Sequence, residues 1–586
     1  MKTILQYMKA HWGRYTTNVL LKTLSTLTEL TIPYILEHII DHVVPTGNLK
    51  LVFAWGLCMI IAVIMVRTIS VGANYRGVAV ARDTIRTLRH DMFQKTINLS
   101  GNQFDSFGLP SLTSRMTSDS YNVQKFLESI QSIGIRAPIQ LMGGIIITMI
   151  MDPVLSSILC VMVPVLGIII FLVTRHGIPL YDKVQQSLDQ VMRIMRENIT
   201  GIRVVKALSK EEYEKNRFDT SNEEMAKRGL KAGMTMATPG PIMQMSLNIG
   251  LVLVVIVGAH RVNSGAAEPG VILAFLTYFN MILHGVMGIN RVFIMSSKAA
   301  ASGYRIGLIL QAPDDQPVLS YSDEDKLDTD AHITFDHVSF GYHTLSADTA
   351  SGNFAGEKQE KCLNDINFSI RHGESLGIIG ATGSGKTTII NLLMRFYDCD
   401  EGNVYIDGRD VRTYDKKELR SKFGIALQND IIFADTLYEN ISFGRDLTLE
   451  QVEKASENAN LSDYINGLDD RFDHMAEIKG ANLSGGQKQR TYIARALAAH
   501  PSILILDDSS SALDYKTDAQ LRKTIQTEYA DTTTIMIAQR VSSIMNLTNI
   551  LVLEDGQAIG YGSHEHLLET CPTYYDIYQS QMGDLN

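Results

Sequence analysis

The chain has 586 residues, which is too long for one hydrophobic core and predicts two or more domains. Its formal net charge of −10 argues against a nucleic-acid-binding protein, because such a protein presents a basic face. The five cysteines are scattered without a Cys-x-x-Cys spacing, so they indicate packed thiols rather than a disulfide framework or a zinc site.

Six apolar stretches in the first half have the length and polarity of membrane-spanning helices. They lie near residues 17–42, 51–73, 130–150, 154–175, 239–261 and 270–295. No cleavable signal peptide is expected before the first stretch, where Lys2, Lys9 and Arg14 have the character of cytoplasmic flanking charge. The two long connections are rich in Arg and Lys, whereas the three short ones carry almost none. The positive-inside rule therefore predicts a multi-pass protein of the cell membrane, with both termini and both long connections in the cytoplasm.

The two long connections, residues 76–128 and 177–235, are expected to be helical. Apolar periodicity continues out of the second span through Val78, Ile85, Leu88 and Met92, and a structureless loop of such length is improbable. Each connection contains a break, at 107–110 and at 208–211. A short helix across each tip and a plain helix-turn-helix tip both fit this pattern.

Several polar residues lie at membrane depth within the predicted spans. They indicate either a substrate pathway or hydrogen bonds between helices, because lipid exposure of such groups is costly. The residues are Glu29, Arg136, Asn248, Asn280 and His284. Methionines in the last two spans fit an adaptable apolar pocket or ordinary packing. They are Met243, Met245, Met281, Met287 and Met295.

The composition divides the chain into a membrane domain over 1–309, a polar linker over 310–331 and an α/β domain over 332–586. Within the last domain, residues 345–361 form a polar, low-complexity stretch, which predicts a surface loop without chemistry.

The α/β domain carries a phosphate-binding loop, GATGSGKTT, at residues 380–388. It follows an apolar strand at 375–380 and precedes a helix at 388–394, which is the context this motif requires. The loop glycines let backbone N–H groups wrap phosphates, Lys386 is expected to reach the β- and γ-phosphates of ATP, and Thr387 to bind Mg²⁺. The remaining nucleotide-binding candidates in this motif are Gly380, Thr382, Gly383, Ser384, Gly385 and Thr388.

Three further residues are expected at this site. Asp507 closes the apolar strand 503–506 and is expected to hold the metal ion. Gln428 follows the strand 423–427 and is expected to contact Mg²⁺ and the γ-phosphate. Tyr342 is placed to stack on adenine.

With the sequence LSGGQKQR at 483–490, the chain resembles the ATP-binding cassette exporters in which one six-helix membrane domain is fused to one nucleotide-binding domain. The resemblance covers nearly the whole chain, including the Ser-Ala-Leu-Asp sequence at 511–514. It implies an α-helical membrane domain joined to an α/β P-loop ATPase. It also implies that two cassettes close head to tail, so that Ser484, Gly485, Gly486, Gln487 and Asp514 face the nucleotide of a partner. The breaks then suggest coupling helices near 107–112 and 208–213.

Two catalytic positions depart from the family pattern. Asp508 stands where the family has its hydrolytic Glu, and Gln539 stands where it has its switch His. Asp is one methylene shorter, and a misplacement of about 1 Å can cost about 10²-fold in rate. Gln539 accepts and donates hydrogen bonds but carries no charge and relays no proton near neutral pH. The site on this chain's own phosphate loop is therefore expected to bind ATP and hydrolyse it poorly.

The unaltered LSGGQ predicts a heterodimer, because it can complete a competent site only on a different chain. The chain thus resembles the degenerate-site subunit of asymmetric bacterial multidrug exporters, with a hydrophobic or amphipathic small molecule as substrate. A homodimeric exporter with slow ATPase and an ATP-gated channel or regulatory subunit are the alternatives. An importer fits poorly, because importers usually keep the two domains on separate chains.

Overall fold

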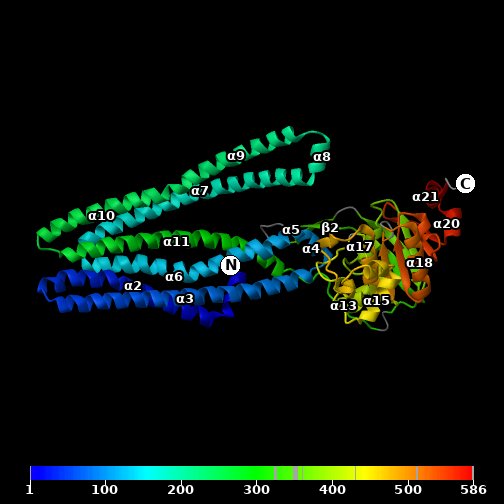
Figure 1. Cartoon of the computed structure of the whole chain (residues 1–586), viewed down its shortest axis with the longest axis horizontal. Coiled ribbons are helices and arrows are strands. Elements are labelled where there is room, and N and C mark those ends of the chain that lie inside the picture. The colour runs from blue at the N-terminus through cyan, green and yellow to red at the C-terminus, as the bar shows by residue number, and fades with distance from the viewer. Residues whose placement is uncertain are drawn as a thin grey trace. The chain divides into compact units, whose positions relative to one another are not determined.

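The computed structural model describes residues 2–322, 326–347, 354–358, 361–428, 430–509 and 513–583. The chain divides into two compact units (Figure 1). The first unit consists of Met1–Ile97 and Pro110–Gln311, and the second of Asn98–Leu109 and Ala312–Asn586.

The first unit is helical. Its helices are α1 (Lys2–Lys9), α2 (Trp12–His38), α3 (Leu49–Ile97), α5 (Leu109–Ser114), α6 (Ser120–Met151), α7 (Pro153–Thr200), α8 (Ile202–Ala207), α9 (Glu211–Ala237), α10 (Pro239–Asn263) and α11 (Pro269–Leu310). Six helical segments of the described chain are long and apolar enough to cross a membrane, which confirms the six predicted spans. Figure 1 shows α2, α3, α6 and α11 running side by side, with α9 continuing into α10 alongside α7.

The predicted helical extensions are confirmed by α3 and α7, which have 49 and 48 residues. At about 1.5 Å per residue each is roughly 70 Å long, whereas the hydrocarbon core of a bilayer is about 30 Å thick. Each helix therefore continues well beyond the apolar part of a membrane. In the most apolar part of α3, only 6% of the residues are buried, as expected for a helix facing lipid.

The predicted short tip helices at 107–112 and 208–213 correspond only in part to the structure, in which Leu109–Ser114 forms α5 and residues 208–210 separate α8 from α9. Two other short helices, α4 (Gly101–Phe107) and α8, end where the predicted helices were to begin. Ser100 caps α4 by accepting a hydrogen bond from the backbone N–H of Gln103, and Gly108 ends it with a φ of 69°. Ser209, with a φ of 51°, follows α8. Gly108 and Ser209 thus follow the short helices, and the next helices, α5 and α9, begin at Leu109 and Glu211.

Helix α4 belongs to the second unit, although it precedes most of the membrane helices in the chain. The backbone N–H of Gly101 donates to the Phe396 carbonyl oxygen at 3.0 Å. The Tyr397 hydroxyl donates to Asp105 Oδ2 at 2.6 Å, and Gln103 Nε2 donates to the Pro313 carbonyl at 2.7 Å. A Cβ atom at position 101 would approach the Tyr397 ring to 2.6 Å, so glycine permits this close packing.

The second unit contains two main sheets. The six-stranded sheet has the order β12 (Gln557–Gly562), β11 (Asn549–Glu554), β5 (Ser375–Gly380), β10 (Thr533–Ile537), β9 (Ile503–Asp507) and β8 (Phe423–Ala426). Its neighbouring strands are parallel except for β12. The antiparallel sheet has the order β4 (Leu363–Arg371), β1 (Ala331–Phe340), β6 (Glu401–Ile406) and β7 (Arg409–Asp410).

Apolar side chains of both sheets pack with α12 (Lys386–Leu393) into one core. The opposite side of the parallel sheet packs on a second core formed mainly by helices. Helices of the second unit beyond α12 are α13 (Lys416–Ser421), α14 (Leu437–Ser442), α15 (Leu449–Asn458), α16 (Ser462–Asn466), α17 (Gly485–Leu497), α18 (Tyr515–Glu528), α19 (Val541–Ile544), α20 (His564–Thr570) and α21 (Pro572–Met582). Parallel strands end at one edge of their sheet, and β5, β9 and β10 bring their C-terminal residues together there.

The stretch at 345–361 is more ordered than the predicted loop. Strand β2 (His343–Ala347) pairs antiparallel with β3 (Phe354–Lys358), while residues 348–353 and 359–360 lie outside the described residues. Backbone pairing forms this ribbon, and a polar composition does not reveal it because β-propensity depends on context.

Candidate nucleotide site

The phosphate-binding loop connects the end of β5 to the start of α12, as predicted. Gly385 precedes the helix with a φ of 98°, and Gly383 has a φ of 87°, a region that disfavours residues with a Cβ atom. A Cβ atom at Gly380 would lie 2.2 Å from the Leu553 carbonyl oxygen. The backbone path of the loop therefore depends on glycine at these positions. Thr382 is exposed on the loop.

Two side chains of the loop are arranged for an anion. Ser384 is 3% exposed, and its hydroxyl has no hydrogen-bond partner. Lys386 Nζ donates to the carbonyl oxygens of Gly380 and Ala381 at 2.9 and 2.7 Å, so its ammonium group closes over the loop. Burial lowers the pKa of Lys386, and the carboxylates of Asp507 and Asp508 oppose that shift. An orphaned hydroxyl, an ammonium group and a helix N-terminus fit a phosphate chain.

Thr387 and Asp507 meet beside the loop. The Thr387 hydroxyl donates to Asp507 Oδ2 at 3.3 Å, and Asp507 is 3% exposed. Burial raises the pKa of Asp507, and the hydrogen bond from Thr387 opposes the shift. A hydroxyl and a carboxylate are hard oxygen ligands of the kind that Mg²⁺ prefers, so the predicted pair fits this metal.

The predicted catalytic positions, Asp508 and Gln539, also meet. Asp508 Oδ2 accepts one hydrogen bond from Gln428 Nε2 at 3.1 Å and another from Gln539 Nε2 at 3.2 Å. Asp508 has a φ of 48°, which is uncommon for a residue with a side chain. Burial raises its pKa, and the Gln428 hydrogen bond opposes this shift. Sequence reasoning placed Gln428 at the metal ion and missed that two amides hold the same carboxylate oxygen.

The LSGGQ sequence forms the start of α17. Ser484 Oγ accepts from the backbone N–H of Gln487 at 3.3 Å, and Gln487 Oε1 accepts from the Ser484 N–H at 2.7 Å. This reciprocal capping box fixes the helix N-terminus. Ser484 and Gly485 are exposed, and Gly486 is half-buried. The Gln487 side chain thus bonds within the start of its own helix, whereas Ser484 and Gly485 remain exposed to solvent.

Two other predicted nucleotide residues have local partners. Asp514 caps α18, with Oδ1 accepting from the backbone N–H of Thr517 at 2.9 Å, and these hydrogen bonds lower its pKa. Ser511 and Ala512, from the same motif, lie outside the described residues. The half-buried Tyr342 bonds the Thr388 hydroxyl at 3.2 Å. Its ring stands edge-on to Phe340 and Tyr397. Stacking of Tyr342 on adenine stays a prediction.

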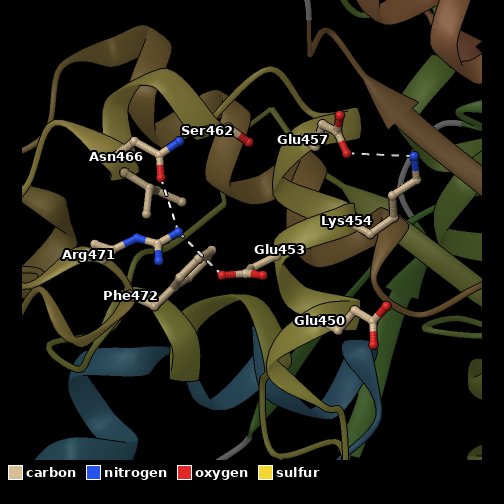
Figure 2. A pocket seen from close by; sticks show the side chains of 9 residues that line it. Glu450, Glu453, Lys454, Glu457, Ser462, Asn466, Arg471 and Phe472 are labelled. Atoms are coloured by element: carbon tan, nitrogen blue, oxygen red, sulfur yellow. Dashed lines mark hydrogen bonds and ion pairs between the residues drawn. The ribbon is translucent and has the colours of Figure 1, made fainter.

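A cavity of about 510 Å³, which the sequence did not suggest, lies among α15, α16 and the segment at 471–472. Figure 2 shows the side chains that line it. Arg471 bonds Glu453 at 3.3 Å and Asn466 at 3.1 Å, while Lys454 lies 3.7 Å from a Glu457 oxygen. None of the residues that line it belongs to the phosphate loop or the LSGGQ sequence. Its polar groups largely satisfy one another.

A cavity of about 840 Å³ lies within the helices of the first unit. Its lining combines cationic and polar side chains with methionines. They include Arg67, Arg136, Gln140, Thr174, His284, Asn290, Arg291, Met236, Met243, Met287 and Met295. Arg136 also pairs with Glu29 at 2.6 Å.

The other polar candidates of the membrane spans do not join this cavity. Asn248 and Met245 line a separate hollow of about 610 Å³. Asn280 donates to the Leu276 carbonyl one turn earlier in its own helix, and Met281 packs against the cluster of Leu30 and Tyr278. Arg136 and His284 therefore line one cavity, whereas Asn248 and Asn280 lie elsewhere, and a substrate pathway through this cavity stays a prediction.

Six apolar helices fused to an α/β domain with a P-loop, an acidic strand end and an exposed LSGGQ helix define a membrane-bound transport ATPase. Comparison with known proteins agrees. The chain matches the family model of the ABC transporter transmembrane region over residues 16–287 and the ABC transporter model over residues 363–511. The protein belongs to the ABC transporter family.

Its relatives match along nearly their whole lengths. An uncharacterized ABC transporter ATP-binding protein of Bacillus subtilis, YfiB, is 32% identical over 95% of both chains. One from Mycobacterium tuberculosis, Rv1273c, is 31% identical over 96% of this chain and 95% of its own. The solved structure of a bacterial Atm1-family ABC exporter with ATP bound has a TM-score of 0.79 at 24% identity, covering 97% of this chain and 98% of that one. This likeness confirms the fold class of a helical membrane domain fused to an α/β ATPase.

Proposed function

We propose that this chain is the degenerate-site subunit of a heterodimeric ABC exporter that expels hydrophobic or amphipathic small molecules across the cell membrane. Its six spans anchor it in the bilayer, and its termini and nucleotide-binding domain face the cytoplasm. The membrane domain covers 1–309, the linker 310–331 and the nucleotide-binding domain 332–586. The related fold of an exporter with bound ATP supports the direction of transport.

In this proposal ATP and Mg²⁺ occupy the phosphate loop. Lys386 neutralises the β- and γ-phosphates, the loop N–H groups wrap them, and Thr387 and Asp507 hold the metal ion. The unpartnered Ser384 hydroxyl and the closure of Lys386 over the loop support this assignment. Binding ATP displaces Lys386 from the loop carbonyls toward the phosphates.

The difference in hydrolysis between the two ATP sites of the heterodimer is supported mainly by the two side-chain amides that bond Asp508. A general base must lie within reach of the attacking water, and two hydrogen bonds to Asp508 Oδ2 hold its shorter carboxylate in place. Movement toward the water breaks bonds that are each worth about 1 kcal/mol. A Gln at position 539 supplies no charge in return. This site therefore holds ATP and turns it over slowly.

The exposed start of α17 supports the proposal that this chain completes an ATP site on its partner. Ser484 and Gly485 lie at a preformed helix N-terminus, whose N–H groups favour an anion. They complete an ATP site on a partner chain that has a Glu and a His at the positions of Asp508 and Gln539. In this arrangement, the ATP molecule that is hydrolysed is the one bound to the partner's phosphate loop.

The membrane cavity supports an amphipathic substrate. Methionines offer adaptable apolar contact, while Arg67, Arg136 and Arg291 offer hydrogen-bond donors and positive charge. A molecule with an apolar body and an acidic or hydrogen-bond-accepting group matches both parts of this lining.

ATPase measurements on purified protein test the proposal. The chain alone is expected to hydrolyse ATP slowly, and the complex with its partner to show substrate-stimulated hydrolysis. Asp508→Asn is expected to leave that hydrolysis largely intact, whereas Glu→Gln at the partner's equivalent position abolishes it. Robust ATPase from the purified homodimer, lost on Asp508→Asn, would instead establish a homodimeric exporter.

A further inference from the structure

Two histidines and an aspartate meet where the strands β1, β4 and β6 of the antiparallel sheet begin or end, away from the residues assigned to ATP. His332 lies on β1, His372 on the turn after β4, and Asp407 on the turn between β6 and β7. One ligand atom from each residue lies within 4.8 Å of the other two. Within the described ranges this is the one group of three such side chains that meets this criterion.

The His332 side chain is fixed and incompletely satisfied. It is 1% exposed, and its Nδ1 bonds the Thr533 hydroxyl at 2.7 Å. The other ring nitrogen, Nε2, is buried without a hydrogen-bond partner and lies 3.6 Å from Asp407 Oδ1. Such a buried polar atom costs free energy unless something binds it.

The surroundings of Thr533 are compatible with a proton on Nδ1 of His332. Its hydroxyl oxygen accepts from the backbone N–H of Gly373 at 3.2 Å and can donate to the Arg371 carbonyl at 3.4 Å. It then accepts from His332 Nδ1–H, which leaves the lone pair on Nε2. A metal-binding imidazole characteristically donates its other N–H to an oxygen in this way.

The other two groups complete a set of ligands. His372 Nε2 lies 3.0 Å from Asp407 Oδ1, and the two imidazole rings stack with centroids 3.7 Å apart. Lys422 Nζ holds the second carboxylate oxygen at 3.0 Å, which leaves Oδ1 for a single bond to a cation. His372 is 63% exposed, so it can rotate out of the stack while His332 and Asp407 stay in place.

We propose that His332, His372 and Asp407 form a binding site for a divalent transition metal such as Zn²⁺. Two neutral imidazoles and one carboxylate oxygen are ligands of the type this ion takes, at about 2.0–2.2 Å. The exposed side of His372 leaves room for water as the fourth ligand. The ammonium group of Lys422 opposes the added charge, so we expect weaker binding than at a closed structural site.

The bound ion joins parts of the second unit that are distant in the chain. His332, His372 and Asp407 come from three segments of the antiparallel sheet, and Thr533 links them to β10 of the parallel sheet. A ligand that binds only the folded state stabilises it by mass action. The metal ion therefore ties three segments of the antiparallel sheet together, and the hydrogen bond from His332 to Thr533 connects this site to the parallel sheet.

Zn²⁺ binding to the full-length chain tests the site. The protein is purified in detergent without a polyhistidine tag, stripped with a chelator and titrated with Zn²⁺ by equilibrium dialysis. The unaltered chain is expected to bind one more Zn²⁺ than His372→Ala and Asp407→Asn, and bound Co²⁺ to give the visible absorption of a tetrahedral site. His372 is exposed, so His372→Ala leaves the fold intact.

His337→Ala is the matched control. His337 also lies on β1 and pairs with Asp365 at 2.6 Å, but both side chains are exposed and lack a third ligand. This variant is expected to keep the full Zn²⁺ stoichiometry. Thr533→Val is expected to weaken binding about 10–100-fold without removing a ligand. Equal Zn²⁺ number and affinity in the unaltered chain and His372→Ala would overturn the proposal.

Discussion

Under the proposed function, Glu at position 508 and His at position 539 should raise ATP hydrolysis at this chain's own site. Asp508→Glu lengthens the side chain by one methylene and brings its carboxylate toward the attacking water. A correction of about 1 Å is worth about 10²-fold in rate, or about 2.7 kcal/mol of barrier. Gln539→His also removes one of the two amide donors that hold the carboxylate at 3.1 and 3.2 Å.

The two substitutions should not act independently, because both change the environment of one carboxylate. With Gln539 still present, Asp508→Glu must break a bond worth about 1 kcal/mol to reach the water, which removes roughly fivefold of its gain. We therefore expect a larger effect from the double variant than from the sum of the single ones, on the order of 10²–10³-fold overall.

The assay is single-turnover hydrolysis of labelled ATP by the purified chain, with protein in excess over nucleotide. The homodimer suffices, because each chain supplies an unaltered LSGGQ to the other. Asp508→Asn combined with Gln539→His is the matched control, since it should bind ATP equally and remain slow. A double variant that binds ATP normally but hydrolyses it no faster than the unaltered chain would refute the reasoning.

Three further predictions concern other parts of the second unit. Gly485→Asp puts a carboxylate at the exposed helix N-terminus, so ATPase of the complex with the partner should fall by about 10²-fold while ATP binding by this chain persists. Tyr397→Phe removes the hydrogen bond to Asp105, worth about 1.5–3 kcal/mol, and should lower the amount of substrate transported per ATP in liposomes. Unchanged coupling would show that this bond does not hold α4 during transport. Arg495→Leu removes the guanidinium group that donates to the Asn440 carbonyl and pairs with Asp430, so thermal unfolding should show a loss of about 3 kcal/mol.

A pH prediction concerns the half-buried His564, which bonds the Tyr574 hydroxyl at 2.8 Å. Burial lowers the pKa of His564, so the unfolded chain binds the proton more readily than the folded one. Its contribution to stability should therefore be present above the ordinary value of about 6.5 and be lost as the pH falls. Melting curves at pH 7.5 and 5.5 should differ less for His564→Gln than for the unaltered chain.

The sequence predicted features that depend on neighbouring residues. The six spans, the helical extensions and the strand–loop–helix of residues 375–393 follow from local hydropathy and glycine placement, and the structure has them. The tip helices were predicted only in part because Gly108 and Ser209 mark where a helix ends rather than where one lies.

Features that depend on distant segments were not predicted. Gln428 is 80 residues from Asp508, and only the alignment of strand ends brings its amide to that carboxylate. The meeting of His332, His372 and Asp407 depends likewise on three separate connections of one sheet. Neither grouping leaves a motif in the sequence, because no fixed spacing is required.

The assignment of residues 98–109 to the second unit means that the chain passes between the units at 97–98, 109–110 and 311–312. A single proteolytic cut at 311 therefore leaves the two fragments associated through α4. A truncated protein beginning at residue 312 lacks α4 and uncovers the surface around Phe396 and Tyr397. A synthetic peptide of residues 98–109 should bind that truncated protein. The peptide would then restore the contacts of α4 that are lost when the second unit is expressed from residue 312 onward.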